Sequence, residues 1–219
     1  MRERPIIFSA PMVRAILEGR KTQTRRVVKW DTARVDGERA SVGPDGYKSV
    51  TDHTIITVPW NSKNIRHLTC LYGEPGDRLW VRETWANFGG DADLYQHHKP
   101  GVAYRATWDG DKYGWPDFAH HVSYVPGDKW RPSIFMPRWA SRITLEITEI
   151  RVQRAQEISG EDIKAEGIEG DYYPDVEATD PHSAAIYYME LWDSLNSKRG
   201  YGWDKNPWVW AITFRRIAP

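Results

Sequence analysis

The chain of 219 residues has almost no cysteine, no net charge and no long apolar run. Its single cysteine, Cys70, excludes an intrachain disulfide and a zinc site made of cysteines, as is typical of proteins in a reducing cytosol. The 30 basic and 30 acidic residues balance, so no overall field draws the chain to nucleic acid or to a membrane. Any contact with nucleic acid must therefore come from a local patch.

No stretch approaches the length of a membrane-spanning helix, and residues 1–5 lack the apolar core of a signal peptide. We therefore expect a cytoplasmic protein with no membrane partner. Residues 29–64 are polar and rich in Gly and Asp, whereas 87–131 hold many Gly, Asp, His and Trp. The length suits one generous domain or two small ones, and we expect a single domain over 1–219 with these two stretches as insertions.

Alternating apolar residues indicate several short strands. In residues 143–152 the alternation changes phase, which predicts a bulge near Thr148 and Glu149. The other expected strands are 5–8, 24–28, 78–83 and 208–215, with 55–58 and 102–105 as the candidates within the insertions.

Three helices are expected between these strands. The first covers 10–18, with Ser9 as a plausible N-cap and Gly19 as a left-handed end. A second, short helix begins at the capping box of Ser159 and Asp162 and ends at Gly167. The third covers 182–195, and its apolar stripe comprises Ala184, Ala185, Tyr188, Leu191, Trp192 and Leu195. Many strands and few helices predict an α+β, mainly β fold that closes as a barrel.

A cluster of cations follows the first helix, in the run Gly-Arg-Lys-Thr-Gln-Thr-Arg-Arg at 19–26. Four positive side chains so close together repel one another, so an anionic or polar partner is expected to offset them. A solvated basic turn is the simpler alternative.

This run resembles the signature of the ASCH family, a branch of the PUA-like β-barrels. Gly19, Lys21 and Arg26 match the family pattern, and Thr24 replaces its usual Glu. That replacement is similar to the bacterial N4-acetylcytidine amidohydrolases, whose pattern residues 19–26 reproduce. Residues 72–85 and 143–168 also resemble the longer, prophage-type ASCH proteins.

Lys21 and Thr24 have side chains suited to nucleophilic catalysis. A threonine hydroxyl attacks only when a base removes its proton, and a lysine is that base only when neutral. Partial burial and the cations of Arg20, Arg25 and Arg26 would lower the pKa of Lys21. On a regular strand Lys21 and Thr24 would point to opposite faces, so the mechanism needs a turn or kink between them. Alternatively, Lys21 caps the carbonyls of the preceding helix and Thr24 is an ordinary strand residue.

The resemblance also implies an acid, because the catalytic Glu of these amidohydrolases matches Glu166. By this carry-over Thr24 attacks the acetyl carbonyl, Lys21 accepts its proton and Glu166 protonates the departing amine, without a metal or organic cofactor. A solvated residue in the last helical turn is the alternative for Glu166, and Glu161 or Asp162 could be mistaken for it.

Five further residues are candidates for substrate binding: Arg20, Arg26, Arg82, Glu83 and Trp203. Arg82 and Glu83 either line the mouth of the barrel or form an ion-paired outer face. Trp203 is one of twelve Trp in the chain. Tryptophans at this density could line a groove that stacks on nucleobases, or they could fill a small core. The pairs His97-His98 and His120-His121 have no metal-ligand spacing, and no metal site is expected.

Three functions remain open at this level. The first is a hydrolase that removes an acyl group from a modified cytidine or a related nucleobase. The second is an RNA-binding module, and the third is an RNA-cleaving enzyme, both activities being associated with ASCH or PUA-like proteins. The expected partner is accordingly a modified nucleoside or RNA, and the oligomeric state is open.

Overall fold

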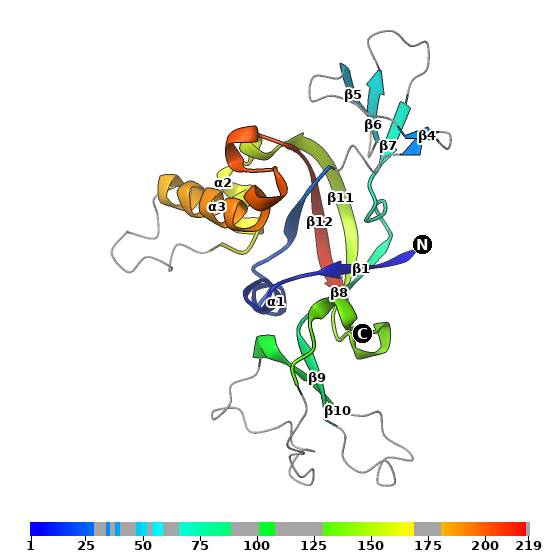
Figure 1. The fold of residues 1–219 in the computed structure, drawn as a ribbon, viewed down its shortest axis with the longest axis vertical. Coiled ribbons are helices and arrows are strands. Elements are labelled where there is room, and N and C mark those ends of the chain that lie inside the picture. Colours follow the sequence, from blue (N-terminus) through cyan, green and yellow to red (C-terminus); the bar gives the residue numbers. More distant parts are fainter. Residues whose placement is uncertain are drawn as a thin grey trace.

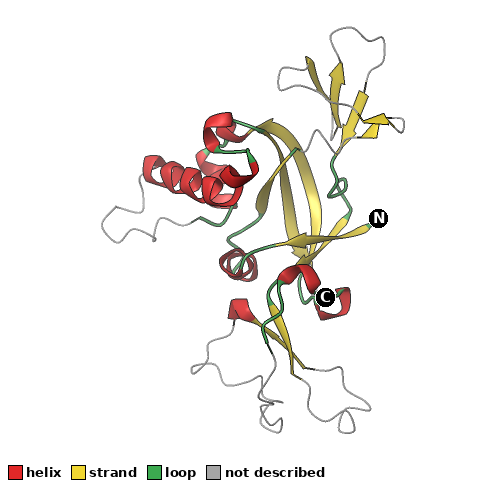
Figure 2. Ribbon diagram, in the orientation of Figure 1, coloured by secondary structure: helices red, strands yellow, loops and turns green. Residues whose placement is uncertain are grey.

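The computed structural model describes residues 1–28, 34–35, 38–39, 47–51, 54–58, 66–88, 101–107, 129–168 and 181–217 of the protein. The fold is α+β and mainly β (Figures 1 and 2). Its strands are β1 (Glu3–Ile7), β2 (Gln23–Val27), β3 (Arg34–Val35), β4 (Glu38–Arg39), β5 (Tyr47–Thr51), β6 (Thr54–Val58), β7 (Arg66–Thr69), β8 (Arg78–Arg82), β9 (Trp85–Phe88), β10 (Gly101–Tyr104), β11 (Thr144–Arg154) and β12 (Trp208–Ile217). Its α-helices are α1 (Ala10–Leu17), α2 (Gly160–Ala165) and α3 (Pro181–Asn196).

A five-stranded mixed sheet in the order β1-β8-β11-β12-β2 forms the centre of the fold. Strand β1 pairs with β8 in parallel, and the other three pairings are antiparallel. Within the described part of the chain, β1 and β2 remain the two edges of this sheet, so the expected closed barrel is not found. Helix α1 links these edge strands, and the side chain of Arg26 spans them by donating to the carbonyl of Ile7 at 2.7 Å.

The predicted bulge is present, because the pairing of β11 with β12 shifts register between Ile147 and Glu149. Gly19 and Gly167 both have positive φ, at 78° and 81°, and end α1 and α2 as expected. Asp162 and Ser159 form the predicted capping box. Ser9 occupies the N-cap position of α1, but its side chain makes no capping hydrogen bond.

The insertions contain more strands than the pattern indicated. Strand β6 corresponds to the predicted 55–58, but β5 and β7 flank it, because polar segments that lack clear alternation can still pair along their backbones. Strand β10 corresponds to the strand expected at 102–105, and β9, which was not expected, pairs with it. The histidine pairs 97–98 and 120–121 lie outside the described residues.

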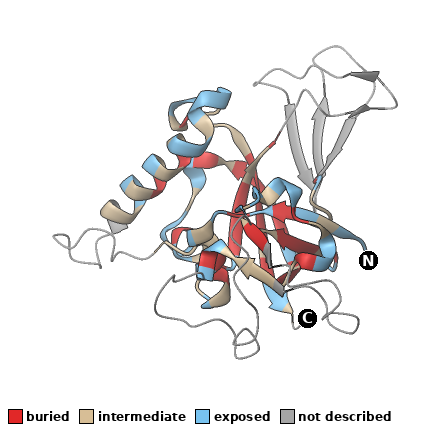
Figure 3. Ribbon diagram, turned by 60° about the horizontal axis from the view of Figure 1, so that its bottom comes forward, coloured by how far each residue is buried: buried red, intermediate tan, exposed pale blue. Residues whose placement is uncertain are grey.

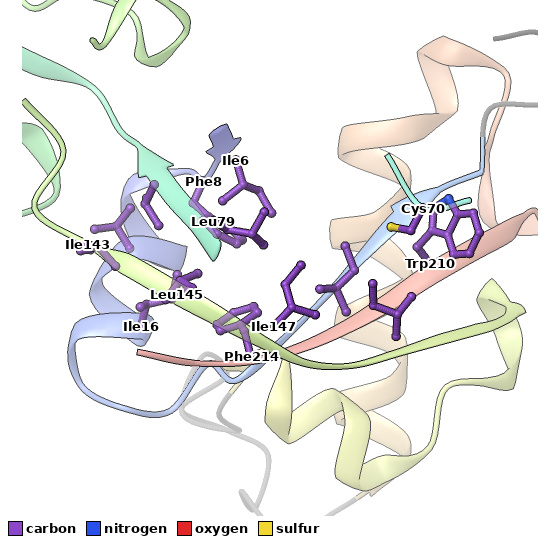
Figure 4. Packing of buried hydrophobic residues seen from close by; sticks show 14 of the residues in the cluster. Ile6, Phe8, Ile16, Cys70, Leu79, Ile143, Leu145, Ile147, Trp210 and Phe214 are labelled. Atoms are coloured by element: carbon purple, nitrogen blue, oxygen red, sulfur yellow. The ribbon is translucent and has the colours of Figure 1, made fainter. Parts of the chain in front are cut away.

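The core lies on both faces of the central sheet (Figure 3). On one face, Phe214 of β12 packs against Phe8, and Trp210 lies beside Cys70 in the same cluster (Figure 4). On the opposite face, Val209 packs against Tyr188 and Trp192 of α3. The stripe prediction for α3 is therefore right for these aromatics but wrong for Ala185 and Leu195, which are exposed. Among the described residues, no helix has the length and apolar character needed to span a membrane.

Candidate active site at the edge of strand β2

Residues 20–22 of the basic run, which precede the edge strand β2, form hydrogen bonds with the end of α2. Arg20 Nη1 donates to the carbonyl of Gly167 at 3.0 Å, and Lys21 Nζ donates to that of Glu166 at 2.9 Å. The backbone N–H of Thr22 donates to the carbonyl of Ala165 at 2.8 Å. Three consecutive residues thus satisfy three consecutive carbonyls at a helix end, where intrahelical donors are missing. The side chain of Lys21 therefore caps α2, while its backbone N–H donates to the carbonyl of Ala15 in the preceding helix at 3.0 Å.

Gly167 permits this close approach of two chain segments. Its φ of 81° is rarely adopted by other residues, and a Cβ built there would lie 2.9 Å from the Cβ atoms of both Ala15 and Lys21. A glycine at this position is therefore needed both for the turn and for the contact. As a result, the backbone of Glu166 forms an isolated antiparallel bridge with Lys21.

Lys21 and Glu166 also form a buried ion pair through their side chains. Lys21 Nζ lies 2.6 Å from Glu166 Oε2, although 145 residues separate the two in the sequence. The side chain of Lys21 is fully buried and that of Glu166 is only 7% exposed. Glu166 is therefore not the solvated helix-end residue considered as the alternative.

A second layer of charged and polar groups surrounds this pair. Arg25 Nη1 lies 3.3 Å from Glu166 Oε1, and its Nη2 lies 2.7 Å from Asp162 Oδ2. Gln23 accepts from Arg25 Nη1 at 2.6 Å and donates to Asp162 Oδ1 at 3.1 Å. Arg151 Nη2 donates to the same Asp162 oxygen at 2.8 Å. Lys21, Arg25, Glu166 and Asp162 thus balance two positive against two negative charges in a largely water-free place, which is the usual condition for burying charge.

The electrostatics of the site act on the proton of Lys21. Burial lowers the pKa of Lys21 and Glu166 opposes this, while the nearby charges of Arg26 and Arg25 lower the pKa further. Lys21 therefore loses its proton to form the neutral amine more readily than a solvated lysine does. The sequence prediction of a lowered pKa agrees in direction, with burial as the main cause.

Asp162 and Tyr188 respond differently to their surroundings. Burial acts to raise the pKa of Asp162, but the hydrogen bond from Arg151 and the charge of Arg25 outweigh it and lower this pKa to about 2. Burial, supported by the charge of Glu166, raises the pKa of the Tyr188 hydroxyl well above its ordinary value, while Arg25 acts in the opposite direction. Asp162 is thus held as a carboxylate, and Tyr188 as a neutral phenol.

Thr24 lies on β2 between Gln23 and Arg25, and it is buried. It pairs with Ile212, so its side chain shares the sheet face that carries the core residues Ile212 and Phe214, opposite to Gln23 and Arg25. Lys21 Nζ approaches the same core face, at 5.8 Å from the centre of the Phe8 ring. Within the described residues no hydrogen bond joins Thr24 to Lys21 or Glu166. At Thr22 the backbone partner changes, because its N–H donates to Ala165 at the end of α2 and its carbonyl accepts from Phe214 of β12.

Of the five substrate-binding candidates, two lie beside the Lys21–Glu166 pair. Arg20 also pairs with Glu18 and remains partly exposed. The Arg26 guanidinium lies 5.2 Å from the Phe8 ring centre and 5.9 Å from that of Tyr72, between the edge strands β1 and β2.

The other three candidates take part in packing elsewhere. Arg82 lies over the Trp80 ring at 4.6 Å, on the outer face of β8. Glu83 is buried, and Arg142 holds its two oxygens at 2.9 and 3.0 Å. The ring of Trp203 packs edge-on against that of Tyr188 at 5.9 Å. Glu83 is ion-paired, as the alternative for Arg82 and Glu83 expected, but it is buried and not on an outer face, and Arg82 contacts an aromatic ring.

Several residues of the site were not identified as such from the sequence. Asp162 was assigned only a capping role, and Gln23 and Tyr188 had no functional role. One signal was available, because Lys21, Gln23 and Arg25 recur with the period of two that places side chains on one face of a strand.

No metal centre is evident here, since the described residues contain no group of three or more His, Cys, Asp or Glu side chains placed to hold an ion. Comparisons with protein-family models, with curated proteins and with solved structures each gave no match.

Proposed function

We propose that the chain is an amidohydrolase that removes an acyl group from the exocyclic amine of a modified cytidine or a related nucleobase. The observation that carries the proposal is the buried contact of 2.6 Å between Lys21 Nζ and Glu166 Oε2. Thr24, three residues after Lys21, is also buried. A lysine buried with a lowered pKa beside a carboxyl group is a suitable acid–base pair for amide cleavage.

The pair has two forms related by one proton. In the ionic form Lys21 is an ammonium and Glu166 a carboxylate, and a proton moved along their contact gives a neutral amine and a carboxylic acid. This transfer leaves the net charge of the site unchanged, so burial does not oppose it and favours the neutral form. The neutral form supplies both groups that acylation needs, a base and an acid.

Acylation begins when Thr24 Oγ1 attacks the acyl carbonyl carbon and its proton passes to Lys21 Nζ. The C–N bond then breaks, Glu166 donates its proton to the departing amine, and an ester remains on Thr24. The ion pair Lys21 ammonium and Glu166 carboxylate is thereby restored. In deacylation Glu166 accepts a proton from the attacking water, and Lys21 returns one to Thr24 Oγ1 as the carboxylic acid leaves. The second half thus regenerates the neutral form, and the sum is amide plus water to amine plus acid.

We also propose that the open five-stranded sheet is a PUA-like scaffold of the ASCH type. The support is local: the motif at 19–26 lies at the junction of a helix and an edge strand, and the segment carrying Glu166 folds against it. This assignment and the hydrolase proposal are separate, because the chemistry rests on the residues and not on the scaffold.

The test is acetate release from N4-acetylcytidine by the wild type and by Lys21→Ala, Thr24→Ala and Glu166→Gln. Turnover by the wild type that is lost in all three variants supports the assigned roles. Turnover that survives in Thr24→Ala contradicts the covalent mechanism but keeps the hydrolase. A folded wild type inactive on both the free nucleoside and acetylated RNA contradicts the hydrolase.

A second candidate, an RNA-binding module, is favoured by one surface. Arg82 and Arg138 lie 4.6 and 5.9 Å from the Trp80 ring centre, and Phe135 and Trp139 are exposed nearby in sequence to Arg138. Guanidinium groups interleaved with aromatic rings are typical of single-strand binding. Salt-dependent binding of single-stranded RNA that weakens in Arg82→Ala would support this function, and binding that Arg82→Ala leaves unchanged would contradict it.

A further inference from the structure

The guanidinium of Arg25 is shared between the proposed acid and a second carboxylate. Its side chain is only 1% exposed, with Nη1 at 3.3 Å from Glu166 Oε1 and Nη2 at 2.7 Å from Asp162 Oδ2. Gln23 Oε1 accepts from Nη1 at 2.6 Å. Because these acceptors lie on different elements, β2 and the α2 segment, the guanidinium is held in place and cannot turn away from Glu166.

A fixed guanidinium affects the two forms of the Lys21–Glu166 pair differently. Arginine keeps its proton in proteins, so its charge favours Glu166 as a carboxylate. Arg25 also disfavours the ammonium of Lys21, but this influence is weaker than those of burial and of Arg26. Arg25 Nη1 lies 3.3 Å from Glu166 Oε1, and this direct contact of opposite charges favours the ionic form of the pair.

We propose that Arg25 is a positioning residue that holds Glu166 as a carboxylate and so favours deacylation over acylation; this inference rests on the proposed function. In deacylation the Glu166 carboxylate accepts the proton of the attacking water. Loss of Arg25 shifts the pair towards its neutral form, which is competent to acylate Thr24 but not to hydrolyse the ester. The acyl-enzyme then accumulates.

Arg151 provides a matched control. Arg151 Nη2 donates to Asp162 Oδ1 at 2.8 Å, whereas among the described residues it has no contact with Glu166. A variant of either arginine removes a cation from Asp162, but only a variant of Arg25 removes one from Glu166. Gln23 still donates to Asp162 in both variants, so the capping box at Ser159 keeps its carboxylate.

The experiment compares the kinetics of Arg25→Met, Arg151→Met and the wild type on N4-acetylcytidine, with intact-protein mass spectrometry of quenched reactions. We expect kcat of Arg25→Met to fall by at least about tenfold while kcat/KM changes by less than about threefold, with an added acetyl group on Thr24 at steady state. Arg151→Met should show neither change. Equal loss of kcat and kcat/KM in Arg25→Met, with no acetylated protein, would overturn the proposal.

A second readout does not depend on turnover. The carbon-13 shift of the Glu166 side-chain carboxyl reports the fraction of carboxylate, and this fraction should fall in Arg25→Met at neutral pH but not in Arg151→Met. Arg25→Lys, which keeps a charge near Glu166, should restore part of it. If the wild type lacks acetate release, the proposed function fails, and this spectrum alone still decides whether Arg25 controls the proton of Glu166. An unchanged carboxylate fraction in folded Arg25→Met overturns that control.

Discussion

Two ion pairs that each hold a buried carboxylate, Glu83–Arg142 and Lys21–Glu166, differ in whether a proton can move. Glu83 and Arg142 join the end of β8 to the segment before β11 through two hydrogen bonds, with the Arg142 guanidinium also 3.9 Å from the Tyr104 ring centre. Lys21 and Glu166 join β2 to the end of α2. An arginine keeps its proton, whereas a buried lysine can lose one, so the first pair is suited to structure and the second to chemistry.

Thr107 contacts Arg142 of the first pair, and Thr24 follows Lys21 of the second pair by three residues, so the largest expected effect can be tested on both threonines. Thr24→Val should reduce acetate release by more than about 10³-fold, because it removes the proposed nucleophile. The free energy of unfolding should change by less than about 1 kcal/mol, since the buried hydroxyl is replaced by a methyl group of similar size. Thr107→Val is the control, because Thr107 accepts from Arg142 Nη1 at 3.1 Å. If Thr107→Val abolishes activity equally, the distinction between the two pairs fails.

The next effect concerns stability and should come from the other pair. Arg142→Met leaves the Glu83 carboxylate buried without its partner, and we expect the free energy of unfolding to fall by about 3 kcal/mol. Urea denaturation measures this change, and acetate release per folded molecule should stay within about twofold of the wild type. A folded variant without activity would show that the Glu83 pair takes part in the reaction.

A smaller effect is the pH dependence of stability, which should differ between the carboxylates of Glu83 and Asp162. Burial raises the pKa of Glu83 despite its bond to Arg142, whereas the pKa of Asp162 is lowered from 3.8 to about 2. Because its pKa is lowered on folding, Asp162 stabilises the folded state at any pH above its pKa in the unfolded chain. This contribution, about 2 kcal/mol, is lost as the pH falls from about 4 towards 2. Comparing urea denaturation of Asp162→Asn and the wild type across that range should show the difference vanish at the acid end. A difference independent of pH would contradict the assigned cause.

The smallest expected effect compares two glycines that both have positive φ. A Cβ at Gly19 would meet nothing within 4 Å, whereas one at Gly167 would lie 2.9 Å from the Cβ of Lys21. Gly19→Ala should lower the free energy of unfolding by about 1 kcal/mol, from backbone strain alone. Gly167→Ala should cost at least about 1 kcal/mol more, because the chain segments must separate, and it should also reduce acetate release. Thermal unfolding of both variants checks this order, and equal costs would argue against a tight contact at Gly167.

Local sequence signals predicted much of the fold. The capping box of Ser159 and Asp162, the bulge before Glu149 and the helix end at Gly19 depend on neighbouring residues only, and all three are present. The additional strands β5, β7 and β9 and the burial of β12 on both faces depend on distant partners, so alternation alone did not reveal them. The open sheet is a similar case, since whether edge strands meet is a long-range property.

For the candidate site, the sequence by itself determined the residue types: a lysine, a threonine and a further cation within 21–25, and a carboxylate before a glycine at 166–167. It could not determine that Lys21 and Glu166 touch, or that Arg25 lies between Glu166 and Asp162. Only the tertiary structure decided this, because the partners are about 140 residues apart and meet where α2 docks on the edge of β2. Burial follows from the same docking, and it is burial that lowers the pKa of Lys21 and separates this lysine from an ordinary surface cation.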